Sequence, residues 1–259
     1  MKTIVTTAGR TNESFIDKAQ TIATELSLSY VNRSKKSVKA MHEQYDSDVL
    51  VVSKERLEYY ANGSNIPFFF HPNSAAFRLK RLLKGESDSF LEATNLKSGN
   101  SFFDATAGLC SDSIIAAYAT GDMGTVYACE VNEIIAYIVS VGLKNYETDF
   151  VELKTCMRNV KLAHVNAVEA LKETESNSYD VVYMDPMFEE LIEESSNFQP
   201  LRAIGQHHLL TLEWVEEAKR VAKKRVVVKA HFRSDLFERF GFHRLTRQTS
   251  KFHYGIIEI

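Results

Sequence analysis

The chain has 259 residues, of which 44% are hydrophobic and 25% charged, and its formal net charge is −3. This composition excludes a disordered chain, and the short apolar runs exclude a membrane-spanning helix, so we expect no membrane partner. Three cysteines without a CxxC pair and an isolated His207-His208 pair favour neither disulfides nor a metal site, and with no secretory signal visible they predict a cytoplasmic protein.

The first part of the chain, residues 1–88, is expected to form a small auxiliary α/β domain that docks the substrate. Short apolar runs predict strands, and Asn12 is a candidate N-cap for a helix that runs to Leu26. A second helix is expected over residues 74–84, followed by a polar linker at 85–89. The expected strands cover residues 3–7, 29–33, 48–53 and 57–60.

The second part, residues 89–259, alternates strand and helix patterns. Short apolar strands that alternate with helices are typical of a parallel sheet covered on both faces, a Rossmann-like α/β fold. After the fifth strand, two strand-like runs follow nearly back to back and predict a C-terminal antiparallel hairpin. The expected parallel strands are 101–105, 125–130, 160–164, 179–185 and 224–230, and the expected helices are 111–120, 132–146, 166–173 and 208–222.

Polar residues stand at the ends of four successive predicted strands, where ligands bind in open parallel sheets. The first strand ends in Asp104-Ala105, and Gly108 lets a ligand approach the backbone before a helix opens at Ser111-Asp112, whose carboxylate is a candidate partner for a cofactor ammonium. Glu130 ends the second strand and can accept both hydroxyls of a ribose. Asn166 follows the third strand and can pair with an adenine edge, although it also suits a helix N-cap.

The fourth strand ends in Asp185-Pro186-Met187-Phe188. An amine conjugated to a ring is a poor nucleophile, and a carboxylate together with a backbone carbonyl can accept its N–H groups and draw its lone pair out of the ring plane. Proline has no N–H to compete for this position, and Phe188 can stack on a planar base. We therefore interpret Asp185, Pro186 and Phe188 as catalytic residues, against the common alternative of a plain Asp-Pro turn.

These motifs, in this order, resemble the class I S-adenosylmethionine-dependent methyltransferases and, among them, the bacterial small-subunit ribosomal RNA guanine-N2 methyltransferase J family. The resemblance covers about residues 49–229 and rests on DATAGLxxD, the acidic end of the second strand, YMDPMF and KRVVVK. It implies S-adenosyl-L-methionine as cofactor and methylation of ribosomal RNA. The implied cofactor contacts are Ser111, Asp112, Glu130, Val131, Asn166, Ala167 and Asp185. The chain departs from the family pattern at Cys110, Ser111, Val131, Glu189 and Ala230-His231.

Two basic clusters in the first part of the chain suit RNA docking, although most runs of charge are simply solvated. Two alternatives stay open: methylation of a small-molecule or protein amine on the same fold, and a non-catalytic RNA-binding module. An NAD-dependent enzyme is disfavoured because the turn after Asp104 has one glycine where a dinucleotide site wants three. The clusters are Arg33, Lys35, Lys36 and Lys39, and Arg78, Lys80, Arg81 and Lys84.

Overall fold

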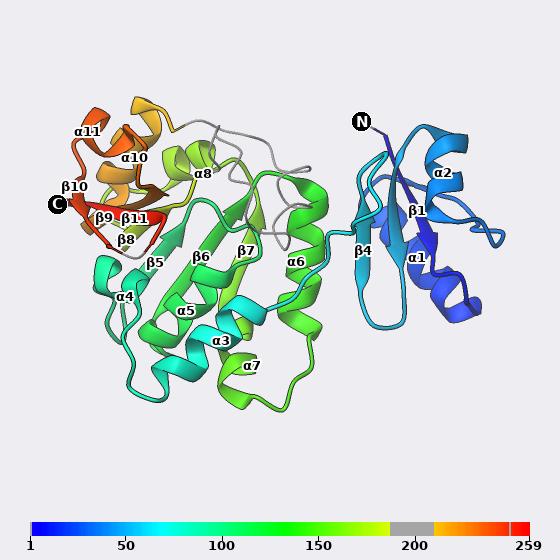
Figure 1. Cartoon of the computed structure of the whole chain (residues 1–259), viewed down its shortest axis with the longest axis horizontal. Helices are drawn as coiled ribbons and strands as arrows, with labels where there is room; N and C mark the ends of the chain where they lie inside the picture. The colour runs from blue at the N-terminus through cyan, green and yellow to red at the C-terminus, as the bar shows by residue number, and fades with distance from the viewer. Residues whose placement is uncertain (1, 187–209, 249) are drawn as a thin grey trace. The chain divides into compact units, whose positions relative to one another are not determined.

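A computed structural model describes residues 2–186, 210–248 and 250–259 (Figure 1). The chain divides into two compact units. Within the described residues, one unit comprises 2–71 and 133–142, and the other comprises 72–132, 143–186 and the described part of 210–259. The two units are described separately below.

The first unit is built on a four-stranded sheet in the order β2-β1-β3-β4. β1 (Thr3–Thr7), β2 (Ser29–Tyr30) and β3 (Asp48–Val52) are parallel, and β4 (Leu57–Tyr60) is antiparallel to β3. α1 (Glu13–Glu25) contacts the three parallel strands and α2 (Val38–Tyr45) contacts β3. Asn12 caps α1 as predicted, since its side-chain oxygen accepts a hydrogen bond from the Phe15 N–H at 3.0 Å.

Most of α6 (Glu133–Asn145) also belongs to the first unit, although the sequence predicts this helix as part of the second domain. The Tyr137 hydroxyl donates to Glu25 of α1 at 2.5 Å. A Cβ built on Gly142 would lie 2.2 Å from Cγ of Phe70, so only a glycine allows this close approach. Long-range packing, which local patterns do not encode, assigns the helix to this unit.

The second unit contains a seven-stranded sheet in the order β10-β11-β9-β8-β5-β6-β7. The first five strands along the chain are parallel, and β11 enters antiparallel between β9 and its hairpin partner β10. The predicted parallel sheet with an antiparallel C-terminal hairpin is therefore confirmed. The strands are β5 (Ser101–Asp104), β6 (Thr125–Glu130), β7 (Val160–His164), β8 (Tyr179–Met184), β9 (Ala222–His231), β10 (His243–Leu245) and β11 (Phe252–Glu258).

Helices pack on this sheet in two groups (Figure 1). One group is α3 (Asn73–Leu82), α4 (Ser89–Thr94), α5 (Ser111–Thr120) and α7 (Val151–Arg158), which contact one another around α5. The other is α8 (Ala167–Glu173) and α10 (Leu212–Val221), which share a core with Phe237 of the short α11 (Leu236–Arg239). Helices α2, α4 and α7 were not expected from the sequence, because each has eight residues or fewer and too few turns to show a clear periodicity.

The segment at 85–89, expected to be a linker, lies inside the second unit. Asp88 caps α4 by accepting the N–H groups of Phe90 and Leu91, and its carboxylate also pairs with Arg78 of α3. The chain leaves the first unit at residue 71, because α3 packs against α5 and α7. The functional division of labour expected on either side of residue 88 stays a prediction.

Candidate functional site

The turn between β5 and α5 is fixed by Asp104, which ends β5 and is 1% exposed. Its carboxylate accepts hydrogen bonds from the Thr106 N–H at 2.9 Å and from the Ser113 hydroxyl at 2.5 Å. Burial raises the pKa of Asp104 to about 7, with the nearby charges of Asp112 and Asp185 adding to the shift despite these hydrogen bonds. The buried carboxylate is therefore poised to change its protonation state near neutral pH.

The same turn has a left-handed backbone at two positions, Gly108 (φ 48°) and Cys110 (φ 57°). Cys110 is buried and stands where the resembling family has glycine, so a residue with a Cβ holds a conformation that glycine adopts more easily. Ala105 is also buried, and its N–H donates to the Tyr183 carbonyl at 2.9 Å, which ties the turn to β8. The turn is thus held rigidly above the carboxyl edge of the sheet.

Asp112, in the first turn of α5, is already surrounded by donors. It accepts from Arg78 Nη1 at 2.5 Å and from the Tyr183 hydroxyl at 2.9 Å, and Lys229 Nζ lies 3.7 Å away. Burial alone would raise the pKa of Asp112, but the charges of Lys229 and Arg78 outweigh it and lower the pKa to about 2. Asp112 therefore stays ionised, and it would have to share its oxygens to serve as the predicted ammonium partner. Ser111, partly exposed, precedes it at the start of the helix.

Asp185 follows β8 and meets both the turn and β9. Its N–H donates to the Thr106 hydroxyl at 2.6 Å, and its Oδ2 accepts from Lys229 Nζ at 2.5 Å. Burial raises the pKa of Asp185, and the Lys229 charge opposes that shift. No further bond to Oδ1 occurs among residues 2–186 and 210–259 as described, which leaves one carboxylate oxygen for a ligand. Pro186 is buried beside it, and the predicted stacking residue Phe188 lies outside the described residues.

Glu130 is the last residue of β6, and both oxygens of its carboxylate accept hydrogen bonds from backbone N–H groups. One oxygen accepts from the Asn132 N–H at 2.9 Å, and the other accepts from the Gly108 N–H at 3.3 Å. A carboxylate offers about four acceptor positions, so acceptor capacity remains for a hydroxyl donor. Burial raises the pKa of Glu130, while these backbone N–H groups and the nearby His164 oppose the shift. The carbonyl of Val131 next to it contacts the His164 ring nitrogen at 3.1 Å.

Asn166 is the N-cap of α8, the commoner of its two predicted roles. Its side-chain oxygen accepts from the Val168 and Glu169 N–H groups at 2.9 and 3.4 Å. These bonds leave the amide NH₂ of the partly exposed side chain to donate to a ligand. Ala167, the first helical residue, is 7% exposed and packs in the core, so only its backbone can serve a ligand.

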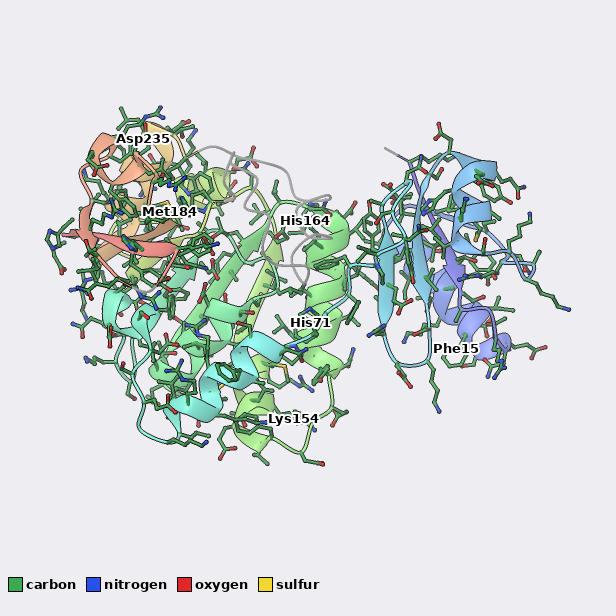
Figure 2. The ribbon with its side chains drawn as sticks, in the orientation of Figure 1. Phe15, His71, Lys154, His164, Met184 and Asp235 are labelled. Carbon is green, nitrogen blue, oxygen red and sulfur yellow. The ribbon has the colours of Figure 1, made fainter. Side chains whose placement is uncertain are left out.

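The structure thus brings the turn, Asp112 and Asp185 into one hydrogen-bonded cluster, and it ties Glu130 to the same turn through Gly108. Asn166 lies at the end of the neighbouring β7 without a bond to the cluster. Figure 2 labels two residues of these strand ends, Met184 before Asp185 and His164 before Val165-Asn166. The parallel register places all these positions on the carboxyl edge of the sheet, as predicted.

The interpretation of the sequence missed the role of two side chains that bond to the carboxylates of this cluster. Lys229 lies in the RVVVK run on β9 and bonds Asp185, although the motif alone does not say which carboxylate it meets. Arg78 was interpreted as part of an RNA-docking cluster, and this is wrong. Its guanidinium is only 17% exposed and pairs with Asp88 at 2.8 Å and Asp112 at 2.5 Å, so it stabilises the site from within.

The cluster carries more negative than positive charge. Arg78 and Lys229 supply two positive charges, whereas Asp88, Asp112 and Asp185 are three carboxyl groups. Asp104 adds a fourth carboxyl group, whose pKa burial raises to about 7. A site of this sign, with low exposure to water, favours a cationic ligand. Among the described residues no group of His, Cys, Asp and Glu has the arrangement of a metal site, and no described helix is long and apolar enough to cross a membrane.

The chain is similar to known proteins over most of its length. Residues 33–252 match the family profile described as "Putative SAM-dependent methyltransferase". The chain is 42% identical over 98% of its length to the uncharacterised protein YpiP of Bacillus subtilis, covering 99% of that protein. It is 32% identical to ribosomal RNA small subunit methyltransferase J of Neisseria gonorrhoeae, over 64% of this chain and just under two thirds, 66%, of that enzyme.

The fold has a solved counterpart. The crystal structure of a SAM-dependent methyltransferase from Neisseria gonorrhoeae superimposes with a TM-score of 0.64 and 20% identity, covering 98% of this chain and 95% of that one. The likeness therefore extends over both compact units. At this identity it establishes the fold.

Proposed function

Since the chain belongs to the family of SAM-dependent methyltransferases, we propose that it methylates the exocyclic amino group of a guanine in small-subunit ribosomal RNA. The observation that carries this proposal is the Asp185-Pro186 strand end, which is bonded to the β5–α5 turn through Thr106 and held by Lys229. The cofactor, S-adenosyl-L-methionine, supplies an electrophilic methyl group.

The donors and acceptors of the site fit that cofactor. Glu130 has acceptor capacity left for a ribose hydroxyl, and the Asn166 amide can donate to an adenine nitrogen. The cofactor bears a sulfonium and an ammonium group, and the excess of carboxylates around Asp104 and Asp185 favours both. Because the demethylated product has lost the sulfonium charge, the same field should bind it less tightly than the cofactor.

The chain's own part in the reaction is to orient the amine. We infer that Oδ1 of Asp185 and the Pro186 carbonyl accept the two N–H groups of the substrate, which turns the nitrogen lone pair toward the methyl group. Burial raises the pKa of Asp185, and the Lys229 charge opposes that shift and so favours the ionised carboxylate, the form that accepts hydrogen bonds. Positioning of this kind supplies much of the rate enhancement when two reactants are held in line.

The RNA substrate rests on two observations. The relative from Neisseria gonorrhoeae that is 32% identical to this chain is named as a methyltransferase of small-subunit ribosomal RNA. The first unit also carries exposed basic residues, including Lys35 and Lys39, that suit phosphate contacts. A small-molecule or protein amine remains the second candidate, because a carboxylate that accepts from an amine does not by itself select a base.

The test is methyl transfer from labelled cofactor to small ribosomal subunits from a strain that lacks this protein. Asp185→Ala should lower kcat about a hundredfold or more, since a positioned acid–base or acceptor group contributes roughly 10²–10⁴-fold, and it should change the cofactor affinity much less. Glu175→Ala removes an exposed carboxylate just before β8 and should behave as wild type. Wild-type turnover by the Asp185 variant would refute its role. Transfer by the wild type to a protein or small amine, and to no RNA, would refute the RNA substrate.

A further inference from the structure

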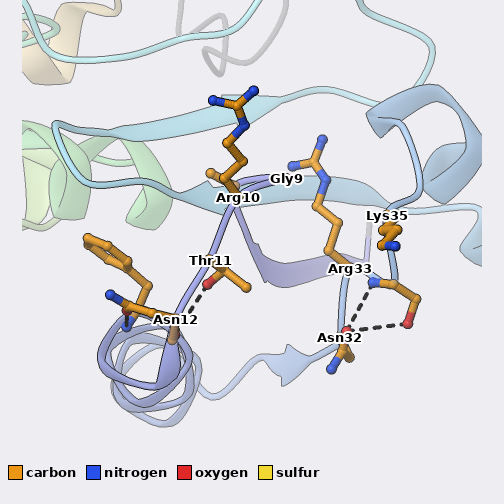
Figure 3. Close-up of a pocket in the computed structure, with 10 residues that line it drawn as sticks. Gly9, Arg10, Thr11, Asn12, Asn32, Arg33 and Lys35 are labelled. Carbon is orange, nitrogen blue, oxygen red and sulfur yellow. Dashed lines mark hydrogen bonds between the residues drawn. The ribbon is translucent and has the colours of Figure 1, made fainter.

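The first unit has an open pocket of about 570 Å³ that the methyl-transfer site does not use. It lies where β1 and β2 end, between the loop that follows β1 and the loop that follows β2. This is the carboxyl edge of the parallel strands, where open α/β sheets bind ligands. Figure 3 shows the residues that line it.

The charges of this pocket have one sign. Arg10, Arg33 and Lys35 line it, and no carboxylate does. Figure 3 shows the guanidinium ends of Arg10 and Arg33 extending in the same direction from the two loops. Within the described part of the chain, neither Arg10 nor Lys35 is in an ion pair, and both are exposed. Three positive charges in one pocket, with no carboxylate among its lining residues, favour an anionic ligand.

Arg33 is held in place while part of its guanidinium stays available. Its Nε donates to the Lys36 carbonyl and its Nη1 to the Thr7 carbonyl, both at 3.0 Å. Nη2 makes no bond among the described residues, and the planar guanidinium matches the oxygens of a phosphate group. Burial lowers the pKa of Arg33, and the charge of nearby Glu58, which does not line the pocket, opposes that shift only in part. A phosphate group in the pocket would give this half-buried cation a further counter-charge.

The remaining lining residues are uncharged, and four of them are polar: Thr11, Asn12, Asn32 and Ser34. Asn32 accepts from the Ser34 N–H at 2.9 Å, which holds the turn at Ser34 and Lys35, both in the left-handed region. This turn carries the Lys35 ammonium at the rim. Gly9, in the loop that follows β1, lines the other side of the pocket. No atom lies within 4 Å of the position that a Cβ would take there, so a ligand has room.

We propose that this pocket binds a phosphate group, and that the backbone of an RNA supplies it. Phosphate binding rests on the pocket alone, whereas the RNA source rests on the proposed function. We expect the pocket to bind the phosphate backbone and not to distinguish between bases. Its cations can contact phosphate oxygens, whereas its one aromatic residue, Phe15, is only partly exposed and offers little surface for stacking. The pocket therefore anchors the substrate and leaves the choice of nucleotide to the other unit.

The experiment measures binding of the full-length protein to a fluorescently labelled single-stranded RNA of mixed sequence over a range of salt concentrations. The double variant Arg10→Ala/Lys35→Ala should lower the slope of log K against log salt by about 1.4, since each contact to a single strand contributes about 0.7. At about 0.1 M salt this corresponds to a loss of affinity of roughly 25-fold. Lys18→Ala/Lys54→Ala removes the same charge from exposed positions in the same unit and should change the affinity little.

Cofactor affinity, measured in parallel, should be unchanged in both double variants, because every predicted cofactor contact lies in the second unit. Equal RNA affinity in the two double variants would overturn the pocket, since the effect would then be one of total charge. Pocket-dependent binding of pyrophosphate or ATP without binding of RNA would overturn the RNA source. Pocket-dependent RNA binding by a protein that does not methylate ribosomal RNA would support this inference and refute the proposed target instead.

Discussion

Lys229 is the side chain whose replacement tests the site most sharply. Its Nζ lies 2.5 Å from Asp185 Oδ2 and 3.7 Å from Asp112 Oδ2, and about a quarter of each of the Lys229 and Asp185 side chains is exposed. Lys229→Met keeps the length of the side chain and removes its charge. An opposite charge at this distance lowers the pKa of a carboxyl group, so its loss should raise the pKa of Asp185 beyond the rise that burial already causes.

The expected result is a shift of the pH–rate profile. If ionised Asp185 accepts from the amine, the acidic limb of kcat should move up by about 1–3 pH units in Lys229→Met, and each unit is a tenfold loss of rate on that limb. Raising the pH should restore the rate. The variant should also lose about 3 kcal/mol of stability, the lower end for one partner of a buried pair, since both groups retain some contact with water.

Methyl transfer to small ribosomal subunits, measured from about pH 5 to 9 at saturating cofactor, gives this profile. Lys224→Met is the matched control, because Lys224 lies on the same strand and pairs with Asp180, but is 59% exposed. Lys229→Arg keeps the charge and should keep the acidic limb near its wild-type position. An acidic limb that does not move in a folded Lys229→Met protein would show that Lys229 does not control Asp185.

Three further outcomes are expected. Glu130→Ala should weaken cofactor binding tenfold or more, since a lost charge-assisted hydrogen bond costs about 1.5–3 kcal/mol; calorimetry showing equal affinity would remove Glu130 from the ribose site. Because burial raises the pKa of Asp104 from 3.8 to about 7, the folded chain holds a proton there that the unfolded chain loses, so its contribution to stability should fall as the pH rises from about 4 to about 7. Urea unfolding of Asp104→Asn should lack this component; an unchanged pH dependence would contradict it. Arg78→Met should cost about 3–5 kcal/mol in urea unfolding, because it removes the ion-pair partner of Asp88 and the nearer of the two cations beside Asp112. Arg81→Met, which breaks an ion pair 47% exposed on the Arg81 side, should cost less than about 1 kcal/mol. Equal losses in the two variants would contradict the buried network.

The sequence by itself determines the sheet of the second unit and the positions of its strand ends. Each parallel strand is a short apolar run, and each polar residue that follows one is carried to the same edge whatever the details of packing. Asp104, Glu130 and Asp185 are found there for that reason. The N-cap role of Asn166 is equally local, because its oxygen bonds to N–H groups two and three residues ahead.

Only the tertiary structure decides which of these groups form ion pairs with one another. Lys229 meets Asp185 because β8 and β9 pair in one register, and a shift of that register by one residue would turn the lysine to the other face of the sheet. Arg78 lies 34 residues from Asp112 along the chain, and the packing of α3 on α5 turns an apparent surface cation into a buried partner. The same holds for α6, whose sequence predicts a helix but whose unit is decided by contacts with Phe70 and Glu25. Local patterns fix elements through backbone propensity, whereas ion pairs between distant residues exist only once the fold has set the distances between them.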